Sequence, residues 1–396
     1  MKLRSFDGIS MEGKKVLVRV DFNVPIKNGN VVDDTRIRAH IETIALLKAS
    51  GAAVVLLSHL GRPKGIRVDE LSLAPIAVSI RDLTGWDIKF ISDCIGEEVR
   101  SAVENMRPGE VTLLENTRFY PEEEKNDNEF SKNLAEPFDL FVMDAFSASH
   151  RAHASTQGVT AFLPSFAGKV MEREVSFLGA VRDFPREPLV LILGGAKVSD
   201  KIKIIRYMLP KSSHILIGGA MAFPFLKASG YGTGRSFNEE GTENTAAELL
   251  ISARKSGVEV ILPVDVVVSD SSLNGSSSFT VKAGDIPHDL MGLDIGPETT
   301  ILFSRAMKKA NTILWNGPLG VFENSPFGEG TRLIGEAVSR KTAEGAVTVL
   351  GGGDTAAAAN LLGFSAGISH VSTGGGATLE FFEGLDLPGI APLIVG

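Results

Sequence analysis

Two lysines four residues apart are the first candidates for chemistry, because they follow a predicted buried strand. Residues 189–193 read LVLIL and end at Gly194 and Gly195, after which the sequence predicts a helix carrying Lys197 and Lys201. A short apolar run ended by glycine is typical of a parallel strand, and the glycines let backbone N–H groups approach a ligand. Two cations on one face at the start of a helix repel each other. The spacing therefore predicts an anion site, with phosphate as the favoured ligand.

The same order of strand, glycines and helix recurs in the second half of the chain. A single glycine pair is better explained by tight packing of a turn, so only the recurrence favours a ligand site. In an open parallel sheet the carboxyl ends of the strands share one edge, where ligands bind. Asp354 lies in one of these turns. The glycine-bearing segments after the predicted strands are residues 194–195, 218–220, 351–355 and 374–376.

The first half of the chain carries polar and cationic residues after its predicted strands. A strand over residues 15–20 ends at Asp21 and Asn23, and a strand over residues 52–57 leads to His59. A guanidinium group presents a rigid fork that matches phosphate or carboxylate. Taken singly, each arginine could simply be exposed to solvent and the histidine could have a structural role. Together they predict a basic pocket for a small anion. The arginines concerned are Arg36, Arg62, Arg118 and Arg151.

Strands that alternate with helices predict an α/β fold with parallel sheets in each half of the chain. About five strands are expected in the first half. Residues 169–184 form an amphipathic helix that ends before Pro185, and this helix is the predicted connector. Residues 269–278 are polar and predict an exposed loop.

The composition excludes several classes of protein. The chain has 396 residues, enough for two domains, and its formal net charge of -8 disfavours nucleic acid and anionic membranes as partners. The single cysteine, Cys94, excludes an internal disulfide framework and a thiolate zinc site. Neither a signal-peptide pattern nor a membrane-length apolar run is present. We therefore expect a soluble, cytoplasmic protein.

A dinucleotide-binding fingerprint is the main competing motif. Gly351, Gly353 and Ala356 satisfy the pattern G-x-G-x-x-A after a predicted strand. The pattern requires an acidic residue about twenty positions further on, and Ser372 stands in that region instead. A nicotinamide-dependent dehydrogenase is therefore disfavoured. Asp354 suits Mg²⁺ better, since Mg²⁺ commonly binds one carboxylate together with phosphate oxygens.

Segments spanning nearly the whole chain, in order, resemble the phosphoglycerate kinase family. Each segment is modestly specific, and jointly they are very specific. The matching segments are RVDFNVP at 19–25, SHLGRP at 58–63, ENTRF at 115–119, HRAH at 150–153, GGAKVSDK at 194–201, WNGP at 315–318, GGGDT at 351–355 and STGGGA at 372–377.

The resemblance implies reversible transfer of a phosphoryl group between ATP and the carboxylate of 3-phosphoglycerate, giving 1,3-bisphosphoglycerate and ADP, with Mg²⁺. It implies two Rossmann-like, three-layer αβα domains with a cleft between them, and usually a monomer. Residues 1–168 would bind 3-phosphoglycerate, residues 169–185 would form a hinge helix, and residues 186–380 would bind the Mg-nucleotide. Residues 381–396 would pack back on the first domain.

The resemblance also implies roles for individual residues. Those expected to hold 3-phosphoglycerate are Asp21, Asn23, Arg36, His59, Leu60, Gly61, Arg62, Arg118 and Arg151. Those expected to hold the nucleotide are Gly195, Lys197, Lys201, Gly219, Gly292, Asn316, Pro318, Glu323, Gly352, Gly353, Asp354 and Thr355, with Asp354 also on the metal side. The candidates for catalysis are Arg36, Lys197, Lys201, Gly375 and Gly376.

The implied reaction needs no general base, because a carboxylate nucleophile is already ionised at neutral pH. Positioning, charge neutralisation and domain closure to exclude water would remain for the protein to supply. Two alternatives stay open at this point. One is a dehydrogenase, and the other is a non-catalytic module that closes on an anion.

One segment departs from the family pattern. The family commonly reads DAFGTAHR, whereas this chain has Ser147, Ala148 and Ser149 between Phe146 and His150. Because Arg151 is kept, the departure concerns the flexibility of the loop and not its ligand.

Overall fold

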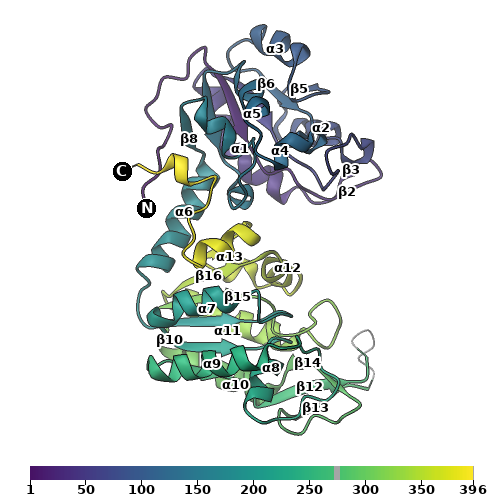
Figure 1. The fold of residues 1–396 in the computed structure, drawn as a ribbon, viewed down its shortest axis with the longest axis vertical. Coiled ribbons are helices and arrows are strands. Elements are labelled where there is room, and N and C mark those ends of the chain that lie inside the picture. Colours follow the sequence, from purple (N-terminus) through teal and green to yellow (C-terminus); the bar gives the residue numbers. More distant parts are fainter. Residues whose placement is uncertain (272–276, 396) are drawn as a thin grey trace. The chain divides into compact units, whose positions relative to one another are not determined.

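The computed structural model describes residues 1–271 and 277–395, and the chain forms two compact units (Figure 1). The N-terminal unit comprises Met1–Ser176 with Asp386–Gly396, and the C-terminal unit comprises Phe177–Leu385. Each unit contains a six-stranded sheet in which every neighbouring pair of strands is parallel. The α/β fold class with two parallel sheets is therefore confirmed, whereas the domain boundaries stay a prediction.

The N-terminal sheet has the order β5-β6-β4-β1-β7-β8. Strand β4 is buried along its whole length, as expected for the apolar run AVVLL, and its neighbour β1 is buried from Val16 to Arg19. Five strands were expected, and the sixth, β8, was missed because three residues, SFA, give no periodic signal. The strands are β1 (Lys15–Arg19), β4 (Ala53–Leu57), β5 (Ile88–Ile91), β6 (Val111–Leu114), β7 (Leu140–Met143) and β8 (Ser165–Ala167), with a small hairpin of β2 (Ile26–Lys27) and β3 (Asn30–Val31).

The helices of the N-terminal unit connect these parallel strands. Proline in the first turn and Gly85 in the left-handed conformation bound α2 at its two ends, as expected for both residues. The helices are α1 (Thr35–Ala49), α2 (Ala74–Thr84), α3 (Glu97–Glu104), α4 (Pro121–Glu124) and α5 (Asn128–Ala135). Helix α6 (Lys169–Asp183) follows β8, and it occupies the position of the helix predicted over residues 169–184.

The C-terminal sheet has the order β11-β10-β9-β15-β16-β17, in which strands follow one another outward from the centre, as in Rossmann folds. A separate antiparallel sheet, β13-β12-β14, was not predicted, because only residues 262–264 separate its central strand from β11 and the two strands were not distinguished. The strands are β9 (Leu189–Leu193), β10 (Ser212–Ile217), β11 (Glu259–Ile261), β12 (Asp265–Ser269), β13 (Phe279–Lys282), β14 (Met291–Ile295), β15 (Thr312–Asn316), β16 (Val347–Gly351) and β17 (His370–Val371).

The helices of the C-terminal unit form two groups. Helix α8 packs on α9 and α7 packs on α13, whereas α11 packs on both α10 and α12. Right-handed crossovers on either side of the central strand place such groups on opposite faces of the sheet, which gives three layers. The helices are α7 (Ile202–Met208), α8 (Ala222–Ala228), α9 (Glu243–Lys255), α10 (Pro297–Ala306), α11 (Glu329–Ala343), α12 (Gly353–Leu361) and α13 (Gly376–Phe382).

The ends of the described chain pair with each other inside the N-terminal unit. Leu3 forms an antiparallel bridge with Ile394, and the backbone N–H of Gly389 donates to the carbonyl of Ser149 at 2.8 Å. Residues 386–395 therefore belong to the N-terminal unit, although they lie last in the sequence.

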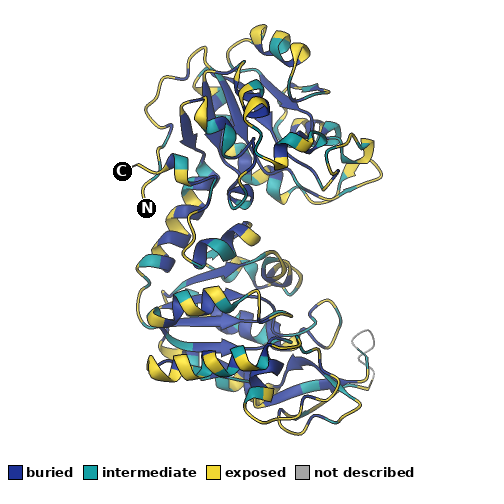
Figure 2. Cartoon of the chain, in the orientation of Figure 1, coloured by how far each residue is buried: buried dark blue, intermediate teal, exposed yellow. Residues whose placement is uncertain are grey.

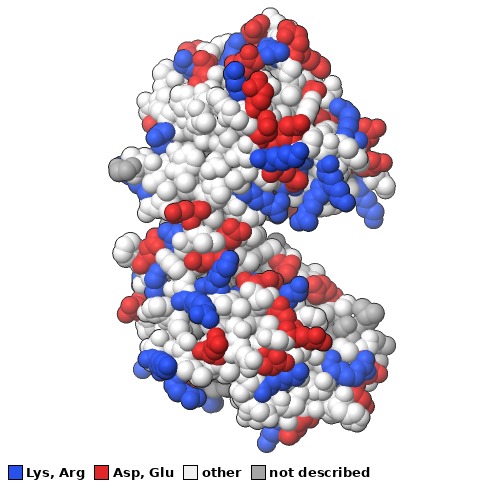
Figure 3. Space-filling model, in the orientation of Figure 1, with Lys and Arg blue, Asp and Glu red and all other residues white. Residues whose placement is uncertain are grey.

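Buried residues concentrate in the strands of both sheets and on the inner faces of the helices (Figure 2). On the face shown in Figure 3, acidic and basic side chains are mixed over each unit. Within residues 1–271 and 277–395, no helix combines the length and the apolar character that a membrane crossing requires.

The loop predicted over residues 269–278 is only partly described. Ser269 is buried as the last residue of β12, where it pairs with Met291 of β14, so the prediction of exposure is wrong at that residue. Residues 272–276 of the predicted loop lie outside the described residues.

Candidate functional site

The N-terminal site lies where the strand order of its sheet reverses. From β1 the chain builds outward through β4 on one side and through β7 on the other. The crevice beyond the carboxyl ends of two such strands is the usual ligand position in open α/β sheets. The loop after β1 carries Asp21 and Asn23, and the loop after β7 carries Ser147. The topology thus brings two segments that are distant in sequence to one point.

Asp21 is the centre of this crevice, and its carboxylate is held on both oxygens. Oδ2 accepts hydrogen bonds from Arg36 Nη1 at 2.8 Å and from the Ser147 hydroxyl, while Oδ1 accepts from the Asn23 backbone N–H at 3.0 Å. Burial alone would raise the pKa of Asp21, but the charges of Arg36 and His59 and these hydrogen bonds lower it to about 2. Asp21 therefore stays ionised at neutral pH.

Hydrogen bonds extend this arrangement to other predicted substrate residues. Arg36 Nη1 also lies 3.3 Å from the Asn23 carbonyl oxygen, and the Asn23 side chain accepts from the backbone N–H of Gly61 at 2.9 Å. The Gly61 carbonyl accepts from Arg118 Nη1 at 2.7 Å. Leu60 is fixed through Asn116, whose side-chain amide donates to its carbonyl at 2.8 Å. The structure thus joins Asp21, Asn23, Arg36, Leu60, Gly61 and Arg118 at one edge.

His59 is buried against a charged interior that the sequence analysis did not assign. Its Nδ1 lies 3.0 Å from Nη2 of Arg19, and Arg19 Nε donates to Ser155 Oγ at 2.9 Å. Ser155 is in turn held by the buried carboxylate of Glu123, which accepts from its backbone N–H at 2.9 Å. Arg19 is only 1% exposed. The sequence did carry a signal for this network, namely Arg19 at the end of the apolar strand β1. An arginine in a buried strand needs a buried partner.

The cations of this site perturb one another. Burial, together with the charge of Arg19, lowers the pKa of Arg118 to about 10, and Arg151 acts in the same direction. Burial and the neighbouring arginines also lower the pKa of His153 to about 3 and that of His59 well below its usual range. Cations that disfavour each other's charge create a site that an anion would stabilise.

Two predicted substrate residues, Arg151 and Arg62, lie outside this hydrogen-bonded network. Arg151 is half-buried and its Nε donates to Nε2 of His150 at 3.2 Å, while Arg62 is exposed in the loop after β4. Burial and the charge of Arg151 lower the pKa of His150. His150 and His153 were not singled out as ligands in the sequence analysis.

The prediction that Lys197 and Lys201 lie on one helix is wrong, because the helix begins later than expected. Helix α7 begins at Ile202, Lys201 is its N-cap residue, and Lys197 lies exposed in the preceding loop. The two lysines therefore do not share a helical face. Residues 194–201 are not helical, and Gly195 has a φ of +97°, which is outside the helical range.

Lys201 and the predicted residues of the next strands are nevertheless linked by side-chain hydrogen bonds. Lys201 Nζ donates to the Asn316 side-chain oxygen, and the Asn316 amide donates to the Gly351 carbonyl at 2.7 Å. The Thr355 hydroxyl donates to the same carbonyl at 2.7 Å and accepts from the Gly317 backbone N–H. Burial lowers the pKa of Lys201, while nearby carboxylates, including that of Asp354, act to raise it.

The glycine turns after β9, β10 and β15 touch each other. Gly194 must be glycine, because a Cβ there would lie 2.1 Å from the Pro318 carbonyl oxygen. Gly195 donates its backbone N–H to that oxygen at 2.8 Å, and Gly219 donates to the Leu319 carbonyl at 3.0 Å. The three turns therefore form one continuous surface at the carboxyl edge of the sheet.

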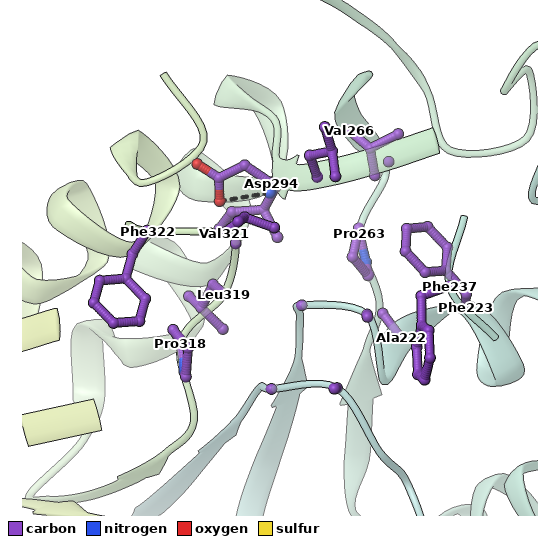
Figure 4. A pocket seen from close by; sticks show the side chains of 18 of the residues that line it. Ala222, Phe223, Phe237, Pro263, Val266, Asp294, Pro318, Leu319, Val321 and Phe322 are labelled. Atoms are coloured by element: carbon purple, nitrogen blue, oxygen red, sulfur yellow. Dashed lines mark hydrogen bonds between the residues drawn. The ribbon is translucent and has the colours of Figure 1, made fainter. Parts of the chain in front are cut away.

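This surface is one wall of a cavity of about 390 Å³ in the C-terminal unit (Figure 4). Phe223 and Phe237 lie on one side of it, and Pro318 and Phe322 lie on the other. The predicted residues that line the cavity are Gly195, Gly219, Gly292, Pro318, Glu323 and Asp354. The aromatic and aliphatic lining was not predicted, because apolar residues in loops and short helices give no signal of exposure to a cavity. A mostly apolar concave site of this size suits a flat ring system.

Asp294 is a buried carboxyl group in the wall of the cavity. Its Oδ1 accepts from the Ile295 backbone N–H at 2.9 Å, and its Oδ2 accepts from the Gly330 backbone N–H at 2.7 Å, in the first turn of α11. Burial raises the pKa of Asp294 well above its usual range. The sequence analysis did not select Asp294, since an acid inside a short strand was not distinguished from a surface residue.

Two helix starts carry further predicted residues, those of the nucleotide set at α12 and the catalytic candidates Gly375 and Gly376 at α13. Gly352 caps α12 with a φ of +94°, so Gly353 and Asp354 occupy its first turn, and both are exposed. Gly375 caps α13, which begins at Gly376. The first backbone N–H groups of a helix have no partner within the helix and favour anions. Of these residues, Asp354 lines the cavity.

Three comparisons with known proteins agree on the family. The phosphoglycerate kinase family model matches residues 6–385. The phosphoglycerate kinase of Pelotomaculum thermopropionicum is 50% identical over 396 residues and that of Borrelia hermsii 48% over 393, with at least 99% of this chain and 100% of each relative covered.

The solved phosphoglycerate kinase of Coxiella burnetii has a TM-score of 0.89 and 38% identity, covering 99% of both chains. That of Pyrococcus horikoshii has a TM-score of 0.83 and 31% identity, covering 99% of this chain and 98% of the other. Sequence and fold therefore agree over almost the full length. The chain belongs to the phosphoglycerate kinase family and is a phosphotransferase.

Proposed function

We propose that the chain transfers a phosphoryl group reversibly between ATP and the carboxylate of 3-phosphoglycerate, giving ADP and 1,3-bisphosphoglycerate. The observation that carries the proposal is that a chain of this family has a cationic edge on one sheet and, on the other, an apolar cavity lined by Gly195 and Asp354. The first suits a small acceptor with two anionic groups, and the second suits a nucleotide.

The acceptor would bind in the N-terminal unit. The arginines there match its phosphate and carboxylate groups, and the buried network around Asp21 and Asn23 would fix its orientation. The residues proposed for this role are Asp21, Asn23, Arg36, His59, Leu60, Gly61, Arg62, Arg118 and Arg151.

The nucleotide would bind in the C-terminal unit, with its base in the cavity beside Phe223 and Gly292. Exposed Glu323 at the cavity would accept hydrogen bonds from ribose hydroxyl groups. Lys197, Lys201, Asn316, Thr355 and the backbone N–H groups from Gly352 to Asp354 would face the phosphates.

Mg²⁺ fits this donor set as a partner of the nucleotide. Among the described residues, no three His, Cys, Asp or Glu side chains gather in a way that could hold a metal ion. Mg²⁺ needs only one or two carboxylates when phosphate oxygens fill its other positions, and exposed Asp354 supplies one. When bound, Mg²⁺ would neutralise charge on the phosphate oxygens.

No general base is needed in the proposed reaction, because the attacking carboxylate is ionised at neutral pH. A bond forms from a carboxylate oxygen to the γ-phosphorus as the bond from that phosphorus to ADP breaks. Arg36, Lys197, Lys201 and the backbone N–H groups of Gly375 and Gly376 would balance the charge on the group in transfer.

The two proposed binding sites belong to different units, so transfer requires a closed state that excludes water. Helix α6 begins in the N-terminal unit and ends in the C-terminal unit, and we propose it as the hinge.

We also propose that the protein is a cytoplasmic monomer without nucleic-acid or membrane partners.

A coupled assay tests the proposed function. With ATP and Mg²⁺ present, addition of 3-phosphoglycerate should start formation of ADP, and omission of either substrate should abolish it. Hydrolysis of ATP at an unchanged rate with and without 3-phosphoglycerate would contradict the proposal.

A further inference from the structure

Ser147 contacts the centre of the acceptor site, although its position was given no role in the sequence analysis. Its hydroxyl donates a hydrogen bond to Oδ2 of Asp21 from the turn after β7. The serine replaces the glycine of the family pattern. Because glycine has no hydroxyl, this contact is a property of this chain and not of the pattern.

The contact changes how many acceptor positions Asp21 has left. An ionised carboxylate can accept about four hydrogen bonds, about two on each oxygen. Oδ2 accepts from Arg36 at 2.8 Å and from Ser147, so both of its positions are filled. Oδ1 accepts from the Asn23 backbone N–H at 3.0 Å. Counting partners among the described residues, one acceptor position remains, and it lies on Oδ1.

The backbone of Asp21 is fixed as well. Its N–H donates to Nε2 of His40 at 3.0 Å, and Nδ1 of His40 lies 2.6 Å from Oδ2 of Asp144. Both His40 and Asp144 are buried, and Asp144 also accepts from the Val170 backbone N–H at 2.9 Å. The free position on Oδ1 therefore has a defined direction.

We infer that Ser147 is a positioning residue that makes Asp21 select the hydroxyl group of the acceptor substrate. The inference rests on the proposed function, in which the acceptor is 3-phosphoglycerate. Its phosphate and carboxylate are anions that Asp21 repels, so its hydroxyl is the group that can donate to Oδ1. Without Ser147, Oδ2 gains a free position and the carboxylate loses one of its two side-chain anchors.

The test compares 3-phosphoglycerate with 3-phosphooxypropanoate, which has hydrogen in place of the hydroxyl. Calorimetry gives the dissociation constant of each ligand for the wild type and for Ser147→Ala. The dissociation constant of 3-phosphooxypropanoate divided by that of 3-phosphoglycerate measures the selectivity for the hydroxyl group. We expect Ser147→Ala to reduce this ratio about tenfold by weakening binding of 3-phosphoglycerate, since hydrogen bonds to charged groups contribute effects of this size.

Ser149→Ala is the matched control, because Ser149 lies in the same turn and its hydroxyl donates to the Phe146 carbonyl at 2.6 Å. This control should keep the wild-type ratio. Ser147→Thr, which keeps a hydroxyl, should also keep it, and both variants should melt within a few degrees of the wild type. An unchanged ratio in Ser147→Ala, or equal weakening of both ligands, would overturn the inference. Absence of turnover by the wild type would instead contradict the proposed function.

Discussion

At the carboxyl edge of the N-terminal sheet the loops carry charged side chains that are buried and bonded to one another, whereas at the same edge of the C-terminal sheet they carry glycines around an apolar cavity. The two sheets differ little in topology. The C-terminal strands follow one another outward from β9, while in the N-terminal sheet β6 is inserted between β5 and β4.

In both units topology fixes where the candidate site lies, whereas the loop residues give the two candidate sites different chemical character. In each unit the site is at the point where the strand order reverses, next to β1 and β7 or next to β9 and β15. Arginine and aspartate side chains there would make directed contacts with a small anion, as proposed. Glycines there would let backbone groups approach a larger ligand and leave room for its ring.

The largest expected effect tests the charged edge. Arg36→Ala should lower kcat by about 100-fold, because removing one preorganised group that stabilises developing charge has an effect of this order. Steady-state kinetics with both substrates saturating measures the change.

Arg38→Ala is the control for that variant. Arg38 lies on the same helix, and its guanidinium pairs with Asp34 at 2.8 Å on an exposed surface. It should leave kcat unchanged. Turnover of Arg36→Ala within a few-fold of the wild type would remove Arg36 from the catalytic residues.

The second prediction is that the stabilities of the two units depend differently on pH. Burial and nearby arginines hold the pKa values of His59 and His153 below their ordinary value of 6.5. The unfolded chain therefore binds more protons below pH 6.5, so stability is present above that pH and is lost on acidification towards pH 3. With about 1.4 kcal/mol for each proton and pH unit, we expect the N-terminal unit to lose about 2 kcal/mol between pH 6.5 and 5.5.

The buried carboxyl group in the wall of the C-terminal cavity gives stability the opposite dependence on pH. Burial raises the pKa of Asp294, so its contribution to stability is retained at low pH and is lost as the pH rises above about 4. Amide hydrogen exchange, corrected for intrinsic rates, should show β1 and β4 losing protection on acidification before β9 and β15. His153→Gln should weaken the effect. Equal loss of protection in both sheets would refute this prediction.

The smallest expected effect concerns the apolar cavity. A Cβ at Gly292 would lie 2.6 Å from Cζ of Phe223, so Gly292→Ala must displace a buried ring that lines the cavity. We expect the KM for ATP to rise about tenfold while the KM for the acceptor substrate is unchanged, because misplacing one contact of a bound ring costs on the order of 1.4 kcal/mol.

Gly232→Ala is the matched control in the same unit, since a Cβ there would meet no atom within 4 Å. It should leave both KM values unchanged. If Gly292→Ala raised the KM for the acceptor substrate as strongly as the KM for ATP, the cavity would not be specific to the nucleotide.

The sequence alone predicted the parallel strands, the two α/β halves and the sheet edges that carry the sites. Runs such as LVLIL in β9 are apolar at every position, and only burial on both faces explains that pattern. Asp21 could be selected because it follows the predicted strand over residues 15–20, and a strand's end has a fixed place in a parallel sheet. Asn316, the last residue of β15, was selected only through the family resemblance.

The tertiary structure decided which loops meet and where their side chains lie. Lys197 and Lys201 are close in sequence, but α7 begins only after Lys201, so the two lysines do not share a helical face. Ser147 and Asp21 are far apart in sequence and are joined only because β7 lies beside β1. Long-range pairing, burial and hydrogen bonding depend on the packed chain, so the cavity wall, the Arg19 network and the raised pKa of Asp294 could not be read from local sequence.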